Sequence, residues 1–325
     1  MPQSLELMIS FQDVQEARER ISKYVRRTPT VRNRTLSEML GTNLYLKLEL
    51  FQTTGAFKIR GAFNKILSEL EHARRAGVVA VSGGNHAQAV AYAGRVLGCR
   101  SVVLTHRSTP RNYIEATRGY GAEVIQLEDI SEAFAKAHDY QDQGMLFVHP
   151  FDDPLVMAGQ GTLGLEILED VPELTDVFVS IGGGGLMSGT AVAIRSQKNV
   201  RFRGVETEGA DAMALALAAG HPIEIRPTSI AKTLGAPSVS FHTLAMAKEH
   251  LLSVTVISDK EAVEALEVLL ERAKVLTEPA ASCTLAAALR LRESFRPDSH
   301  VVLILCGGNL GVEDLCEYHA RFLKS

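Results

Sequence analysis

Short apolar runs alternate with longer amphipathic stretches along most of this chain. Short apolar runs bounded by glycine or polar residues are typical of buried strands, whereas apolar residues spaced three and four apart are typical of helices. The pattern predicts strands at residues 44–48, 78–81, 101–104, 123–126, 145–148, 176–181, 201–206 and 300–305. It predicts helices at residues 10–24, 87–97, 111–120, 163–169, 186–196, 259–274 and 282–294. Ser10 and Asp13 have the spacing of a capping pair at the start of the first helix.

The alternation of strands and helices is typical of βαβ units, which form parallel sheets. It runs up to about residue 150 and begins again after it, so we expect two sheets. No low-complexity linker or short repeat separates the two parts, which predicts that the lobes are interleaved rather than strung together. The expected fold class is therefore α/β, with two interleaved open twisted sheets flanked by helices.

The composition narrows the class of protein. With 325 residues and 46% hydrophobic content, the chain can bury a core large enough for two lobes. A net charge of -4 leaves no basic surface for nucleic acid, and no apolar run approaches the ~20 residues of a membrane helix. We therefore expect small-molecule partners, with no nucleic acid and no membrane. The start at Met1–Gln3 lacks signal-peptide features and the four cysteines form no CxxC pair, so a cytoplasmic location is expected.

A run of four glycines, Gly182 to Gly185, separates a predicted strand from a predicted helix. Bare amides at a helix N-terminus can bind an anion such as phosphate, because the helix dipole adds positive potential there. The run is not a Walker A loop, which requires Lys and then Ser or Thr. A dinucleotide site would place a third glycine at Ser188, although Glu206 stands where the ribose-binding acid would lie. A tight turn without a ligand is the other interpretation.

Lys58 lies between apolar neighbours, with Ala56 and Phe57 before it and Ile59 after it. Apolar surroundings disfavour the charged ammonium and lower the pKa of the amine, which makes it available as a nucleophile. Such a lysine can form a Schiff base. Most lysines are solvated, however, so this position alone does not separate a catalytic lysine from an ordinary one.

A second glycine-containing loop, Ser82 to Gln88, follows the predicted strand 78–81 and leads into the predicted helix 87–97. Its side chains and amides are therefore expected to face the same site, at the carboxyl ends of the strands. Asn85 can hydrogen-bond a phenolate oxygen and Ser82 a carboxylate. The alternative is that both residues only cap the helix.

Six motifs follow one another along the chain: Gly55–Ala62, Ser82–Gln88, Ala158–Thr162, Gly182–Gly185, Glu278–Pro279 and Cys306–Asn309. Their order resembles the one found in fold-type II pyridoxal 5′-phosphate (PLP) enzymes. Over residues 28–309 the sequence resembles the serine/threonine dehydratase (threonine ammonia-lyase) family, with serine racemase as a near relative. The resemblance implies a tryptophan synthase β-like fold. In that fold, residues 1–75 and 150–325 would form a large PLP-binding domain and residues 76–149 a small mobile substrate domain.

The resemblance also implies roles for individual residues. Lys58 is expected to be the catalytic residue, which binds PLP covalently and removes the Cα proton. The expected cofactor-binding residues are Phe57, Lys58, Asn85, Gly182, Gly183, Gly184, Gly185, Leu186, Glu278 and Cys306. The expected substrate-binding residues are Ser82, Gly83, Asn85 and His86. Of these, Ser82, Asn85 and His86 are expected to bind the substrate carboxylate.

Cys306 stands where the relatives usually have a serine beside the pyridine nitrogen, and a thiol is a weaker hydrogen-bond partner than a hydroxyl. We expect this nitrogen to stay unprotonated, which disfavours a long-lived carbanion and favours loss of a β leaving group. The expected activity converts a β-hydroxy amino acid (threonine, serine, 3-hydroxyaspartate or 3-phenylserine) to a 2-oxo acid and ammonia. An amino-acid racemase and a β-replacement synthase of the same fold are the alternatives. Gly83 argues against racemisation, because serine racemases carry their second base, a serine, at this place.

Other positions in the sequence bear on metal binding, the substrate pocket and assembly. Glu206 and Ala210 match the divalent-cation site of some relatives, but Ala212 replaces the second carboxylate, so no metal site is expected. Thr233 stands where relatives often have glycine near the substrate, which changes the shape of the pocket. Relatives are usually dimers, so we expect a homodimer.

Overall fold

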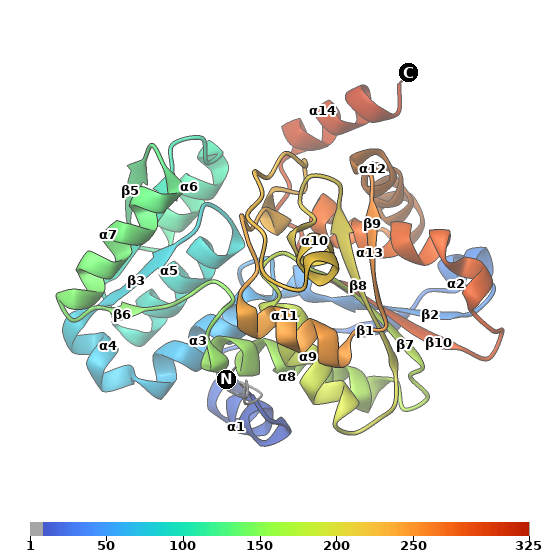
Figure 1. Ribbon diagram of the computed structural model, residues 1–325, viewed down its shortest axis with the longest axis horizontal. Helices are drawn as coiled ribbons and strands as arrows, with labels where there is room; N and C mark the ends of the chain where they lie inside the picture. Colours follow the sequence, from blue (N-terminus) through green and yellow to red (C-terminus); the bar gives the residue numbers. More distant parts are fainter. Residues whose placement is uncertain (1–8, 325) are drawn as a thin grey trace.

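The computed structural model describes residues 9–324 and contains two sheets, drawn on the right and left of Figure 1. The larger sheet has the strand order β1 (Thr30–Arg32), β2 (Asn43–Leu48), β10 (His300–Leu305), β7 (Asp176–Ser180), β8 (Arg201–Thr207), β9 (Ser253–Ile257). The smaller sheet has the order β5 (Glu123–Leu127), β4 (Ser101–His106), β3 (Val78–Val81), β6 (Leu146–Phe147). All neighbours are parallel except β1, which is antiparallel to β2. The chain enters the larger sheet, builds the smaller one and returns, so the predicted interleaved α/β class is confirmed.

Helices flank both sheets (Figure 1). The α-helices are α1 (Phe11–Ile21), α2 (Arg34–Leu40), α3 (Lys58–Ser68), α4 (Leu70–Ala76), α5 (Asn85–Leu97), α6 (Arg111–Gly119), α7 (Ile130–Asp142), α8 (Pro154–Asp170), α9 (Gly185–Arg195), α10 (Ala212–Ala219), α11 (Phe241–His250), α12 (Asp259–Val268), α13 (Pro279–Arg290) and α14 (Val312–Phe322). Shorter helical turns are η1 (Glu49–Phe51), η2 (Lys232–Leu234), η3 (Leu269–Ala273) and η4 (Arg292–Ser294). Within residues 9–324, no helix combines the length and the apolar character needed to cross a membrane. The residues at Met1–Gln3, on which the signal-peptide prediction depends, lie outside the described part.

Each predicted strand is present, and the capping pair at the start of α1 is confirmed. The Asp13 amide donates to Ser10 Oγ at 3.3 Å, and the Ser10 amide donates to Asp13 Oδ2 at 2.7 Å. The apolar pattern did not predict β1 and β9. Strand β9 lies at the edge of the larger sheet and four of its five residues are half-buried, so its sequence mixes Ser and Thr with Val.

Helix α8 is much longer than predicted, because the sequence analysis expected a helix only at residues 163–169. The helix begins at Pro154, because Asp153 caps it by accepting the amides of Leu155 and Val156 at 2.8 and 3.0 Å. The glycines in the first half of α8 are positions of close helix packing. A Cβ atom at Gly159 would lie 2.7 Å from the Arg60 carbonyl oxygen, and one at Gly161 would lie 2.6 Å from the Gly189 carbonyl oxygen. Glycine therefore lets α8 approach α3 and α9.

Two other helices differ from the prediction at their ends. The helix expected at residues 259–274 ends at Val268 and continues only as the π turn η3, after which Lys274 adopts φ 61°. Helix α13 begins at Pro279 rather than at residue 282 and ends at Arg290 rather than at 294. Proline is favoured at the first position of a helix, because an N–H group there has no hydrogen-bond partner within the helix. Glu278 is therefore the N-cap residue of α13.

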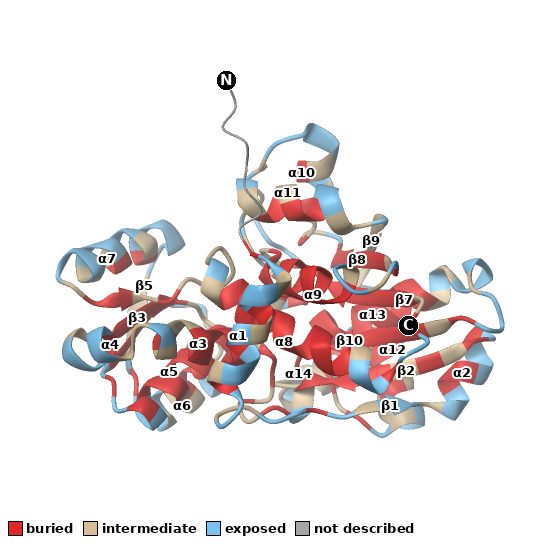
Figure 2. Cartoon of the chain, turned by 90° about the horizontal axis from the view of Figure 1, so that it is seen from below, coloured by how far each residue is buried: buried red, intermediate tan, exposed pale blue. Residues whose placement is uncertain are grey.

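The core consists mainly of two apolar clusters, and the buried residues of both sheets and their helices are red in Figure 2. The larger cluster surrounds the six-stranded sheet and includes side chains of α8, α9 and α13. The second joins α3 and α5 to β3 and β6. Helix α3 packs against both α5 and α8, so it connects the small sheet to the large one.

Candidate active site

The residues singled out in the sequence lie at the carboxyl ends of strands from both sheets. The Ser82 loop follows β3, the glycine turn follows β7, and the segment from Cys306 to Asn309 follows β10. The carboxyl edge of a parallel sheet is where ligands bind in open α/β folds. Contacts among these segments, described below, bring them together in one site.

Lys58 is the first residue of α3 and is held by the segment that follows β10. The Phe57 amide donates to the Cys306 carbonyl at 3.0 Å, and Ala56 forms a bridge with Gly307. The Lys58 Nζ donates to the Pro150 carbonyl at 2.6 Å. Burial lowers the pKa of the amine to about 8, in the direction that its apolar neighbours predict.

The glycine turn lies close to this lysine, because Phe151 follows Pro150 and packs on the turn. A Cβ atom at Gly183 would overlap the Phe151 ring, and one at Gly185 would lie 2.8 Å from the Phe151 carbonyl oxygen. Gly184 has φ 98° and is the N-cap of α9, a left-handed conformation that favours glycine. The turn therefore presents bare backbone at the N-terminus of a helix, next to the lysine.

The Ser82 loop does not have the capping arrangement that was the alternative interpretation. Helix α5 begins at Asn85 itself, and its N-cap, Gly84, supplies no side-chain bond. Ser82 Oγ accepts the Gly84 amide at 3.1 Å, which closes a local turn. Asn85 points into the site instead, and the capping interpretation is wrong for it.

Asn85 belongs to a buried polar cluster centred on Glu278. Its Nδ2 donates to Glu278 Oε1 and Oε2 at 2.9 and 3.2 Å, and its Oδ1 accepts Asn309 Nδ2 at 2.8 Å. The Asn309 amide and Thr233 Oγ1 also donate to Glu278, at 2.9 and 2.7 Å. Burial raises the pKa of Glu278, while these hydrogen bonds favour its charged form. The sequence analysis gave no role to Asn309, although it ends the last of the six motifs.

His86 is buried and its ring nitrogens have different environments. Nε2 lies 2.8 Å from the Val148 carbonyl oxygen and therefore carries the proton, while Nδ1 is buried and has no hydrogen-bond partner among residues 9–324. Burial and the nearby Lys58 lower the pKa of His86 to about 3, so the ring is neutral. A neutral ring in this tautomer has no N–H to offer a carboxylate through Nδ1. The backbone amide of His86, in the first turn of α5, remains able to donate.

Cys306 is buried at the end of β10. Its Sγ accepts Ser180 Oγ at 3.3 Å and lies 3.6 Å from the Ala280 carbonyl oxygen. Burial and the proximity of Glu278 raise the pKa of the thiol to about 12, so it is uncharged. The chain thus places a neutral group, and not a carboxylate, at this position.

Gly83 faces two threonines of the small sheet and the loop after it. A Cβ atom at Gly83 would overlap Thr109 Oγ1 and lie 2.9 Å from Thr105 Oγ1, and these two hydroxyls are hydrogen-bonded at 2.6 Å. A serine at this position requires the threonine pair to move.

We therefore expect Gly83→Ser to lose activity without gaining racemisation. Overpacking costs about 1–3 kcal/mol, and the same amount added to the activation free energy corresponds to a roughly tenfold to hundredfold loss of turnover. Chiral analysis of serine after incubation, together with a 2-oxo acid assay, measures both effects. The double variant Gly83→Ser with Thr109→Gly should recover part of the turnover, because the crowding is relieved. Efficient D-serine formation by the single variant would contradict this interpretation of Gly83.

Glu206 caps a helix. Its Oε1 and Oε2 accept the amides of Met213 and Ala214, both at 2.8 Å, at the start of α10. Burial raises the pKa of this carboxyl to about 8. Within residues 9–324, no group of three or more His, Cys, Asp or Glu side chains has a geometry that could hold a metal ion.

Comparison with known proteins agrees with this geometry. Residues 21–307 match the protein family described as "Pyridoxal-phosphate dependent enzyme". An L-threonine ammonia-lyase of Geobacter sulfurreducens is 41% identical over 312 residues, which cover 95% of this chain and 77% of that protein. An L-threo-3-hydroxyaspartate ammonia-lyase of Saccharomyces cerevisiae is 36% identical, with 94% of both chains covered. The structure of maize serine racemase superposes with a TM-score of 0.90 at 33% identity and covers 98% of both chains.

Proposed function

Because this chain belongs to the family of pyridoxal-phosphate dependent enzymes, we propose that it is an ammonia-lyase acting on a β-hydroxy amino acid. It eliminates water across Cα and Cβ, and a water molecule then hydrolyses the released enamine to a 2-oxo acid and ammonia. The observation that carries the proposal is Lys58, an amine whose pKa is lowered by burial and which lies beside a bare glycine turn.

The residues present fit the cofactor. The amides from Gly183 to Leu186 would hold its phosphate at the N-terminus of α9, where the helix dipole favours an anion. Gly182 and Gly183 are partly exposed, and neither carries a side chain that could cover these amides. Lys58 would bind the aldehyde, and Phe57, Asn85, Glu278 and Cys306 would surround the ring. When bound, pyridoxal phosphate supplies an electron sink for negative charge at the substrate Cα.

The environment of Cys306 favours elimination over transamination. The thiol is neutral, so Cys306 provides no negative charge that would keep a proton on the ring nitrogen. A weaker electron sink favours prompt loss of the β substituent over a long-lived carbanion.

Residues of this chain would bind the substrate carboxylate and remove the Cα proton. Ser82 and the free amides of Asn85 and His86 would bind the substrate carboxylate, with the helix dipole of α5 assisting. The neutral ring of His86 fixes the loop through Val148 and does not itself donate to the carboxylate. The Lys58 amine, once free, removes the Cα proton.

The role of Lys58 as a base sets a pH dependence. With the pKa of its amine lowered to about 8, Lys58 is mostly protonated below that pH and cannot accept a proton. We expect turnover to rise about tenfold per pH unit on the acidic side and to level off above about pH 8. Measurement of kcat across this range checks the expectation. A rate that is constant through pH 8 would contradict this expectation.

The substrate is identified by a panel assay. The purified protein with added cofactor is offered threonine, serine, 3-hydroxyaspartate and 3-phenylserine, and both 2-oxo acid and ammonia are measured. We expect the two products in equal amounts from at least one of them. A requirement for sulfide or another nucleophile would favour a β-replacement synthase, and D-amino acid formation at a comparable rate would favour a racemase. No release of 2-oxo acid from any β-hydroxy amino acid would end the proposal.

We make further proposals on the assembly, the location and the domain movement of this protein. We propose a cytoplasmic homodimer, which is consistent with four free cysteines, of which three are buried, and with exposed apolar side chains such as Phe241 and Val312. We also propose that residues 76–149 move as one unit on the remainder of the chain when substrate binds. The separate four-stranded sheet supports this division. Sedimentation and small-angle scattering with and without substrate test these statements.

A further inference from the structure

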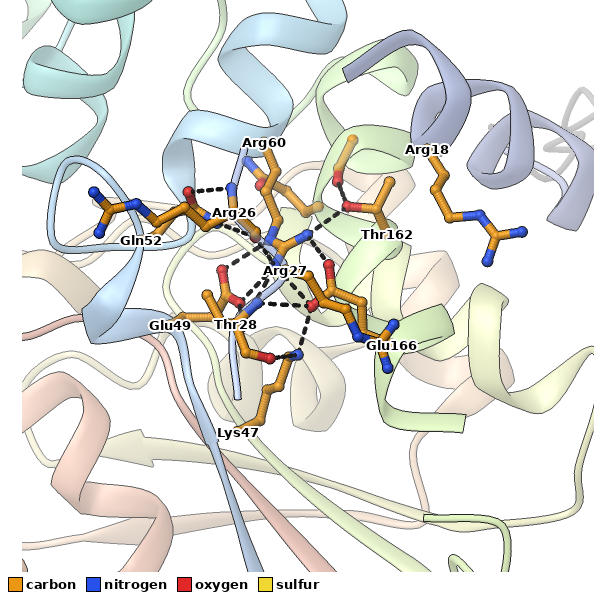
Figure 3. A network of polar contacts seen from close by, with 12 residues as sticks. Arg18, Arg26, Arg27, Thr28, Lys47, Glu49, Gln52, Arg60, Thr162 and Glu166 are labelled. Atoms are coloured by element: carbon orange, nitrogen blue, oxygen red, sulfur yellow. Dashed lines mark hydrogen bonds and ion pairs between the residues drawn. The ribbon is translucent and has the colours of Figure 1, made fainter. Parts of the chain in front are cut away.

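A buried cluster of four charged side chains lies beside the first turn of α3 (Figure 3). Its members are Lys47, Glu49, Arg60 and Glu166, and we call it the Arg60 cluster. The side chains of Lys47, Glu49 and Arg60 are fully buried, and that of Glu166 is 10% exposed. Two positive and two negative charges balance, so the cluster is neutral as a whole.

Arg60 occupies the centre of the cluster, and its N–H groups are all directed at acceptors. Nε and Nη2 donate to the two oxygens of Glu49, both at 2.8 Å. Nη1 and Nη2 donate to the two oxygens of Glu166 at 2.7 and 3.0 Å, and Nη1 also donates to Thr162 Oγ1 at 3.1 Å. Only the planar fork of an arginine can bridge two carboxylates in this way.

The cluster joins three elements that surround the start of α3. Glu49 lies directly after β2, and Glu166 lies on α8. Lys47 Nζ donates to Glu166 at 2.5 Å and to the Thr28 carbonyl at 2.7 Å, which adds the segment before β1. Arg60 is only two residues beyond Lys58, so the first turn of α3 is fastened to β2 and α8 at this point.

The first turn of α3 has two attachments: the Phe57 amide bonds to the segment after β10, and Arg60 bonds to Glu49 and Glu166. The N-cap residue, Phe57, adds no side-chain hydrogen bond at this end of the helix. Buried ion pairs often stabilise a fold no better than well-packed apolar residues do. They do, however, restrict the relative positions of the elements they join, since each charge must keep its partners.

We propose that Arg60 is a positioning residue for Lys58. By holding both Glu49 and Glu166, it prevents α3 from rotating or sliding on α8, and this keeps the Lys58 amine beside the Pro150 carbonyl and the glycine turn. The inference rests on the role proposed above for Lys58.

The test compares two arginine-to-lysine variants. Arg60→Lys keeps the charge but replaces the fork by a single ammonium, which cannot bridge both carboxylates. Arg203→Lys is the matched control. Arg203 is also buried and forms an ion pair with Asp176. It lies near the amino ends of β7 and β8, at the edge of the sheet opposite the site.

Three quantities are measured for each variant and for the unaltered chain: the thermal unfolding midpoint, the rate of covalent cofactor uptake by cofactor-free protein, and kcat with KM. A displaced amine reacts slowly, and a shift of about 1 Å can reduce a rate roughly 100-fold. We expect Arg60→Lys to reduce uptake and kcat by about tenfold to 100-fold with a much smaller change in KM. We expect Arg203→Lys to lower the unfolding midpoint and leave the uptake rate of the folded protein within about twofold, because its site is intact.

The outcomes are distinguishable. If both variants lower the unfolding midpoint and neither alters uptake or kcat, the cluster is structural only and the proposal is overturned. Lys58→Ala, measured in parallel, separates this from a failure of the assignment of Lys58, because uptake should then disappear whatever Arg60 does. If Arg60→Lys does not fold, Glu49→Gln replaces it, since the amide keeps the shape of the carboxylate and loses one acceptor. The same slow uptake is expected of it, and normal uptake would count against the proposal.

Discussion

Lys58→Ala should abolish turnover and the visible absorbance of the bound cofactor. The substitution removes the amine that would bind the cofactor aldehyde and take the Cα proton, and loss of a general base alone reduces a rate by up to about 10⁴-fold. Absorbance of the purified protein and a 2-oxo acid assay measure the two effects. The fold should persist, because alanine favours the helix that Lys58 begins.

Lys65→Ala is the matched control for this variant. Lys65 lies on the same helix, donates to Glu69 at 2.8 Å and forms an ion pair with Asp153 at 3.1 Å. It makes no contact with the glycine turn or with Glu278 among the contacts of residues 9–324. It should keep the cofactor and most of its activity. If Lys58→Ala retains both colour and turnover, a different lysine binds the cofactor.

Gly184→Ala should weaken cofactor binding strongly. At this position alanine meets two obstacles, since φ is 98° and the new Cβ would lie 2.7 Å from the Thr243 Cβ. A left-handed residue other than glycine costs about 1–2 kcal/mol, and overpacking adds about 1–3 kcal/mol. We expect the Kd for pyridoxal phosphate to rise by roughly 100-fold, because the turn must change shape to relieve both. Titration of cofactor-free protein measures it.

Gly220→Ala separates backbone strain from damage to the turn. Gly220 has φ 83°, and a Cβ atom there would have no neighbour within 4 Å. It follows α10 and is exposed, so its alanine variant should lose stability and keep cofactor affinity. Equal affinity for Gly184→Ala and the unaltered chain would show that the turn does not hold the phosphate.

Most of the strands were predictable because their signals are local. Buried parallel strands such as β3 and β10 are continuous apolar runs. The apolar neighbours of Lys58 predicted the lowered pKa of its amine, whereas its catalytic role was assigned only from the resemblance. The glycine turn after β7 was also predictable, since four consecutive glycines between a strand and a helix have few structural uses.

Other features could not be predicted because they depend on distant parts of the chain. Glycine usually weakens a helix, so the helical state of Gly159 and Gly161 in α8 follows only from the close approach of α3 and α9. The contact between Asn85 and Glu278 joins residues 193 positions apart. The burial of Arg60 could not be predicted from the sequence either. An arginine in a helix is normally exposed, and nothing near Arg60 in the sequence indicates that Glu49 and Glu166 pair with it in the fold.

Reductive trapping tests the assignment of Lys58 most directly. The protein loaded with cofactor is treated with borohydride, which fixes the cofactor to the amine that binds it, and the modified peptide is identified by mass spectrometry. We predict that the cofactor mass is found on Lys58 and on no other lysine. Labelling of another lysine, such as Lys47 or Lys65, or the absence of any label on a catalytically active protein, would contradict the assignment.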